Sequence, residues 1–203
     1  MRLAWIILTF LLGSCSEPPS AFEQKSHDVL KRDLVMNYQH HGNSFQALAS
    51  ELASLKQVSS IRFKYGHLGT EGIAFWFNST GSDAVDRTLV VPSLNDSRLP
   101  RTLQQEGLTV TYIKSLQSRL ASLHCCGFYR LETININTGT PYIHIELQYD
   151  GWNGANFYCY KLFDKKMEPD MVDFFDRQHV KMGSLSGTGG VLDSNAVWYI
   201  RLD

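Results

Sequence analysis

The 203-residue sequence has no long apolar run after its first fifteen residues, so we expect no membrane-spanning helix in the body of the chain. It also has no excess of charge of one sign, because 19 lysines and arginines are set against 20 aspartates and glutamates. Nucleic-acid-binding proteins usually carry a basic surface. This balance therefore predicts no nucleic-acid partner.

Motifs that bind phosphate or activate a nucleophile are missing as well. The glycine-rich stretch 183–190 has the composition of a phosphate loop, but it has no lysine and a strand is predicted after it. Ser186 within this stretch is not enclosed in the pattern Gly-x-Ser-x-Gly. We therefore assign no catalytic residue and no cofactor.

The N-terminus carries the clearest signal. Arg2 supplies a positive charge, and residues 3–12 are apolar apart from Thr9. This run is too short for a permanent membrane span, and the small residues Gly13 and Ser14 follow it. Such a pattern predicts a secretory signal peptide.

The tetrapeptide Leu12-Gly13-Ser14-Cys15 resembles the lipobox of bacterial lipoproteins. The resemblance covers only residues 1–15, and it implies removal of residues 1–14 and acylation of Cys15. The segment 15–20 would then be the lipidated cysteine and its tether, attached to the membrane through acyl chains alone. Ser16 after the cysteine implies the outer membrane, facing the periplasm, over the inner membrane. Cleavage after Ser16 is the alternative and would release a soluble secreted protein.

Three further cysteines lie in the body of the chain, Cys125, Cys126 and Cys159. Thiols outside the cytoplasm tend to oxidise, and adjacent cysteines rarely bridge each other. We therefore expect a disulfide between Cys126 and Cys159, with Cys125 as the alternative partner. A zinc site with His124 lacks a visible fourth ligand, and the neighbours His40 and His41 are too few, so we assign no metal.

The rest of the chain, 21–203, reads as one α+β domain built on an antiparallel sheet. Apolar spacing predicts helices over 21–38 and 44–57, with a break at His40–Asn43. Strands are predicted at 61–65, 72–78 and 88–91, the first two as a hairpin.

The second half seems built to the same plan, with a displacement of 68 residues. A helical stripe from Ile113 to Leu123 precedes strands at 128–136, 142–149 and 157–163. Two helix–strand–strand–strand repeat units, 44–92 and 111–163, follow from this reading, and Arg62 matches Arg130 between them. A helix beginning near Pro169 and a closing strand at 196–202 complete the chain.

Two pairs of side chains are candidates for acid–base chemistry. Glu132 and Glu146 lie on neighbouring strands of the second predicted hairpin and would form a carboxylate pair if they faced each other. His179 follows Asp176 at a helical i, i+3 spacing. An envelope hydrolase that uses these groups is the alternative function.

Aromatic residues favour a binding protein over an enzyme. Because strands alternate, Phe75-Trp76-Phe77 must place at least one ring on each face of the sheet. An exposed ring suits a protein partner, whereas helices on both faces would make these rings core. In layout alone, the domain is similar to uncharacterised periplasmic and outer-membrane lipoproteins, including immunity and inhibitor proteins. We expect a non-enzymatic envelope lipoprotein that binds another extracytoplasmic protein.

Overall fold

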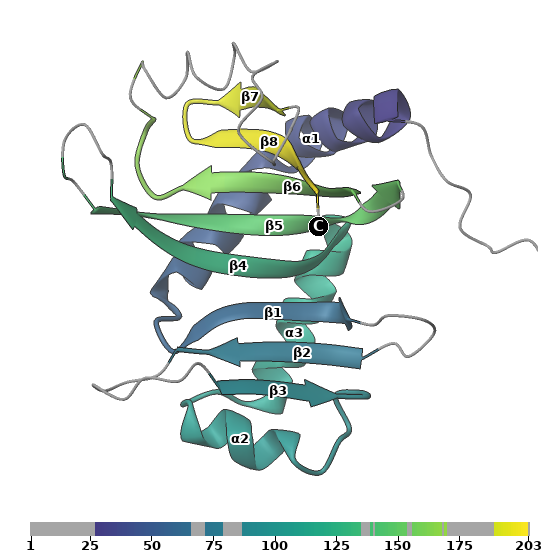
Figure 1. Ribbon diagram of the computed structural model, residues 1–203, viewed down its shortest axis with the longest axis vertical. Coiled ribbons are helices and arrows are strands. Elements are labelled where there is room, and N and C mark those ends of the chain that lie inside the picture. Colours follow the sequence, from purple (N-terminus) through teal and green to yellow (C-terminus); the bar gives the residue numbers. More distant parts are fainter. Residues whose placement is uncertain are drawn as a thin grey trace, which may run out of the picture.

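The computed structural model confirms the predicted α+β class, with three helices and an eight-stranded antiparallel sheet in the described part of the chain (Figure 1). It describes residues 27–65, 72–78, 87–134, 139, 141–153, 156–167, 169 and 189–202. The helices are α1 (His27–Ser54), α2 (Leu99–Gln105) and α3 (Val110–Ser122). The strands are β1 (Val58–Tyr65), β2 (Gly72–Phe77), β3 (Arg87–Val91), β4 (Cys125–Ile134), β5 (Pro141–Asn153), β6 (Asn156–Phe163), β7 (Gly189–Asp193) and β8 (Ala196–Leu202).

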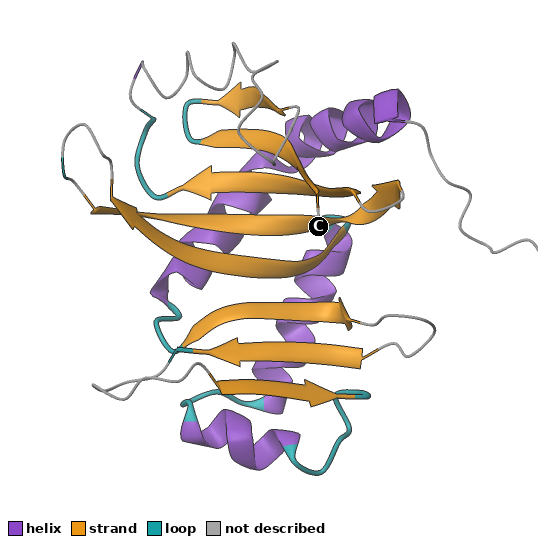
Figure 2. Cartoon of the chain, in the orientation of Figure 1, coloured by secondary structure: helices purple, strands orange, loops and turns teal. Residues whose placement is uncertain are grey.

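Helices α1 and α3 lie on one face of the sheet, whose strand order is β3-β2-β1-β4-β5-β6-β8-β7 (Figure 2). Figure 1 is seen from the opposite side, which we name the front face. The main core fills the space between the sheet and the helices. One register row crosses all eight strands there, and its members are Leu89, Phe75, Ile61, Phe128, Leu147, Tyr160, Trp198 and Gly190.

Helix α1 is longer than the sequence suggests. The predicted break at His40–Asn43 is instead a kink inside α1, where His41 has φ −124° and ψ 15°. Leu34 before the kink and Phe45 after it are both fully buried in the same core. Because both stripes pack on one sheet, helical structure continues through a stretch of weak helix formers.

The two predicted helix–strand–strand–strand units appear in the observed order, with α2 added between them. They meet at the seam between β1 and β4, where Ile61 pairs with Phe128. The helix ends Ser54 and Ser122 are 68 residues apart, but the strand starts Val58 and Cys125 are only 67 apart. The second connection is one residue shorter.

This difference corrects the predicted match of Arg62 with Arg130. A shift of one residue in a strand turns every side chain to the other face. Arg62 lies on the front face, paired with Gly127, whereas Arg130 is on the helix side and donates from Nε to the carbonyl of Ala53 (2.9 Å). Its buried guanidinium thereby satisfies a carbonyl at the C-terminus of α1.

Each long helix packs on strands of the other unit. Helix α1 contacts β5 and β6, and Figure 1 shows α3 passing behind β1, β2 and β3. Buried side chains of both units belong to one continuous cluster. The units therefore share a core.

The seam between the units is short and closely packed. Only three registered pairs join β1 to β4 in the described chain, Ser60–Tyr129, Ile61–Phe128 and Arg62–Gly127. A Cβ atom at Gly127 would lie 2.7 Å from the carbonyl oxygen of Ile61. Glycine is thus required there by the approach of the neighbouring backbone.

The outer edge of β3 is covered by α2, a helix that the sequence reading missed. Its residues Leu99 and Leu103 are fully buried against the main core. Arg98, held by an ion pair to Asp96 (2.9 Å), donates to the carbonyl of Val90 on this edge. A covered edge offers little to the strand of another chain.

Several predictions fall on residues outside the described part of the chain. These are the signal peptide, Cys15, the tether, the helix beginning near Pro169 and most of the stretch 183–190; His179, Asp176 and Ser186 lie there too. Gly189 and Gly190 begin β7. Among the described helices, none has the length and apolar character needed to cross a bilayer.

Candidate functional site

The front face carries polar and aromatic side chains in two register rows that cross the whole sheet. The first row is Thr88, Trp76, Ser60, Tyr129, Glu146, Lys161, Val197 and Val191. The second row is Val90, Ala74, Arg62, Gly127, Gln148, Cys159, Tyr199 and Gly189. Two clusters stand out within these rows, one on each side of the seam.

The first is the Arg62 cluster, formed by Arg62, Trp76 and Tyr129. The guanidinium carbon of Arg62 lies 5.0 Å from the ring centre of Tyr129 and 5.9 Å from that of Trp76. Both distances fall within the range of cation–π attraction. In the register, Ala74 and Gly127 flank Arg62, and their small size leaves room for its side chain to lie over the rings. All three members of the cluster are half-buried.

The placement of Trp76 confirms that the three consecutive aromatics divide between the faces. Phe75 and Phe77 are buried in the main core, where their rings stack at 6.0 Å. Trp76 points to the front face and pairs with Ser60. Most other described aromatics of the hairpins, including Tyr149, Tyr158 and Tyr160, are core residues.

The second is the Glu146 cluster, formed by Glu146, His144, Lys161 and Tyr199. Glu146 Oε1 lies 3.3 Å from Lys161 Nζ and 3.4 Å from His144 Nε2, while the residue is only 5% exposed. The hydroxyl of Tyr199 donates to the same carboxylate. A buried carboxylate with this many partners is strongly held.

The two titratable groups of the pair carry different charges at neutral pH. Burial raises the pKa of Glu146, but the hydrogen bond from His144, the charge of Lys161 and the hydroxyl of Tyr199 outweigh it and lower that pKa to about 2. Burial is the main cause that lowers the pKa of His144 below its ordinary value. Glu146 is therefore ionised beside a neutral imidazole, whose Nδ1 lies 3.4 Å from Thr133 Oγ1.

This charge state does not suit proton transfer. A general acid or base works best when its pKa is near the operating pH. The predicted partner, Glu132, lies on the other face of the sheet and accepts from buried Arg130 (2.7 Å). The structure therefore does not bring Glu132 and Glu146 together.

The predicted bridge between Cys126 and Cys159 is not formed, and the three described cysteines are free and buried. Strand β5 lies between the strands that carry them. Neighbouring strands are about 4.8 Å apart, so β4 and β6 are separated by about 10 Å, whereas a disulfide spans no more than about 7 Å between Cα atoms.

Burial is also the main cause that raises the pKa of the Cys126 thiol to about 12 and that of Cys125 well above its usual value. A thiol with a raised pKa is a weak nucleophile and metal ligand. In the described ranges, no three His, Cys, Asp or Glu residues are grouped so that they could hold a metal ion. His40 and His41 are exposed on α1.

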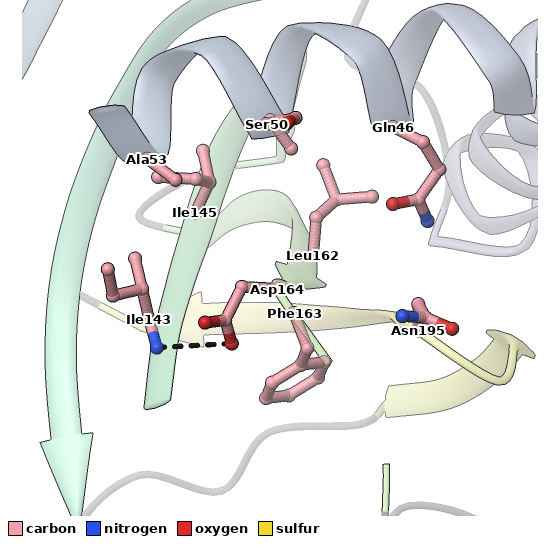
Figure 3. A pocket seen from close by; sticks show the side chains of 10 residues that line it. Gln46, Ser50, Ala53, Ile143, Ile145, Leu162, Phe163, Asp164 and Asn195 are labelled. Atoms are coloured by element: carbon pink, nitrogen blue, oxygen red, sulfur yellow. Dashed lines mark hydrogen bonds between the residues drawn. The ribbon is translucent and has the colours of Figure 1, made fainter. Parts of the chain in front are cut away.

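Two hollows lie away from both clusters. The smaller, about 160 Å³, lies between α1 and the ends of β5 and β6, where the N–H of Ile143 donates to Asp164 (3.2 Å; Figure 3). The larger, about 550 Å³, opens between α3 and the start of β2, with Phe63 and Ile73 among its lining residues. Lys114 is the one charged side chain among its described lining.

Sequence reasoning singled out Trp76 and Glu146, but it missed Arg62, Tyr129, Lys161 and Tyr199 as their neighbours. The alternation of polar and apolar residues around Arg62 and Tyr129 places each on a strand face. It gives no information about which strands lie side by side, and that order brings the clusters together. In comparisons with protein-family models, curated proteins and solved structures, this chain matches none.

Proposed function

We propose that this chain is a lipid-anchored protein of the bacterial cell envelope that binds another extracytoplasmic protein through the front face of its sheet. The Arg62 cluster is the observation that carries the binding function. Tryptophan, tyrosine and arginine are the residue types most enriched among those that dominate binding energy at interfaces. Here they meet on three adjacent strands, and none is fully buried.

The cluster is also prepared for binding before a partner arrives. The Arg62 side chain is held over two rings, and those rings stand on paired strands in the middle of the sheet. Ordering a long side chain at an interface costs about 0.5–1.5 kcal/mol. A side chain that is already ordered avoids much of this cost.

The anchor is supported by residues 1–15. Acyl chains on Cys15 would contribute about 0.8 kcal/mol per buried methylene, enough for two or more chains to hold the domain at a membrane. We place the protein at the outer membrane, facing the periplasm, because Ser16 follows the acylated cysteine. A partner would then be an envelope protein that meets the front face in the same compartment.

Replacing Trp76 with alanine should weaken the complex with this partner by at least about 2 kcal/mol, or roughly thirtyfold in affinity. The ring provides most of the apolar area of the cluster and one side of the Arg62 stack. The measurement is quantitative capture of partner proteins from envelope extracts by the full-length protein. Met36→Ala is the matched control, because Met36 is 46% exposed on α1, away from the front face.

Equal recovery of the same partner by the wild type, Trp76→Ala and Met36→Ala would contradict binding through the front face. So would loss of the partner with Met36→Ala alone. Circular dichroism of each variant separates weakened binding from lost folding.

A further inference from the structure

The front face has a bias of charge on the side of the Arg62 cluster. Its described side chains on β1 to β4 include two cations, Arg62 and Lys64, and no carboxylate. The others are Ser60, Ala74, Trp76, Thr88, Val90, Gly127, Tyr129, Leu131 and Thr133. Acidic residues are thus absent from this described part of the face, although the whole chain has a net charge of −1.

The two cations differ in what they offer. Lys64 forms an ion pair with Asp150, and both side chains are about half exposed. Arg62 lies flat between the rings of Trp76 and Tyr129, which leaves the edge of a planar guanidinium as its recognition element. Arginine in this arrangement favours carboxylate or phosphate, which it can bind through two parallel hydrogen bonds.

The number of cations favours a carboxylate over a lipid headgroup. Anionic membranes are recognised by clusters of about four to eight lysines and arginines. Arg62 and Lys64 fall short of that number, and the carboxylate of Asp150 beside Lys64 would repel an anionic surface. One arginine between two rings suits a single acidic side chain with an apolar neighbour.

We infer that the Arg62 cluster recognises an aspartate or glutamate of a partner protein, flanked by an apolar or aromatic residue that packs on Trp76 and Val90. Val90 lies beside Ala74 in the register and is 45% exposed, so it extends the apolar surface toward β3. This inference rests on the proposed binding function and adds the chemistry of the partner.

The test uses the mature chain with Cys15→Ser, titrated with the peptide acetyl-Tyr-Asp-Glu-Asp-Tyr-amide and followed by NMR at the indole N–H of Trp76. Its matched control is the same peptide with Asn-Gln-Asn in place of the acidic residues. The acidic peptide should bind at least about tenfold more tightly, because hydrogen bonds to charged groups are worth about 1.5–3 kcal/mol. Arg62→Gln should abolish this preference, and Arg62→Lys should reduce it because lysine lacks the planar fork.

Vesicles rich in phosphatidylglycerol form the second arm, and they should leave the Trp76 signal unchanged. Equal binding of the two peptides, binding of neither, or binding of vesicles in place of the acidic peptide would overturn the inference. The capture experiment distinguishes its failure from that of the proposed function. A partner lost with Trp76→Ala but retained with Arg62→Gln would overturn the acidic partner alone, whereas a partner retained with both would overturn front-face binding as well.

Discussion

Phe128→Ala should lower the free energy of unfolding by about 3–5 kcal/mol, the usual range for a fully buried phenylalanine. Phe128 is at the centre of the core row and pairs with Ile61 across the seam between the two units. Only three registered pairs make that seam in the described chain. A cavity there removes packing from both units, so neighbouring residues can relax little to fill it.

Urea denaturation followed by circular dichroism measures this effect. Leu131→Ala is the matched control on the same strand, because Leu131 is 39% exposed and its loss should change the free energy by less than about 1 kcal/mol. Single domains are stable by about 5–15 kcal/mol, so the Phe128 variant would lose a large fraction of the total. Equal effects of the two substitutions would contradict a shared core at the seam.

Glu146→Gln should cost about 3 kcal/mol at pH 7, and this cost should disappear in acid. The pKa of Glu146 is lowered from 4.5 to about 2, and each unit corresponds to about 1.4 kcal/mol. Because the folded state binds the proton more weakly, the ionised carboxylate stabilises the fold above pH 4.5. That contribution is lost as the pH falls from 4.5 toward 2. Removal of one partner from a buried ion pair typically costs about 3–5 kcal/mol, which agrees in size.

The measurement is the difference in unfolding free energy between wild type and Glu146→Gln at pH 7, 5, 4 and 3, taken as about these values. Using the difference cancels the titration of other carboxylates. Glu132→Gln is the matched control on the same hairpin, since the Glu132 side chain is 67% exposed, and it should change stability by less than about 1 kcal/mol. A difference for Glu146→Gln that stays the same from pH 7 to pH 3 would show that the charge of this residue does not stabilise the fold.

Periodicity was enough to predict most of the elements. The stripe Phe45, Leu48 and Leu52 is buried as expected on the second half of α1, and Ile113, Leu116 and Leu120 are buried on α3. Alternation in β1 and β2 identified the first hairpin. These signals are local, because burial of one face requires one spacing in a helix and another in a strand.

Features that depend on distant parts of the chain were not predictable in the same way. Helix α2 has only seven residues and one clear signal, Pro100 in its first turn. The faces of Arg62 and Arg130 depend on a connection that is shorter by one residue, which a displacement of 68 between the helices does not reveal. Cys126 and Cys159 were paired without knowledge that β5 separates their strands.

The same limit applies to the site. Glu146 was singled out, but its expected partner Glu132 lies on the opposite face, and its observed partners include His144 on its own strand and Lys161 on the next. A polar residue every second position is the visible sign of a front face. The identity of its neighbours depends on strand order and register.

The most direct test of the account is whether Cys15 carries acyl chains, because the compartment and the class of partner both depend on it. Cells producing the full-length protein are labelled with a clickable fatty-acid analogue, and the protein is then isolated. We expect label on the wild type and none on Cys15→Ser. A wild-type protein that stays unlabelled, in cells whose known lipoproteins take up the analogue, would contradict the lipid anchor and the location proposed from it.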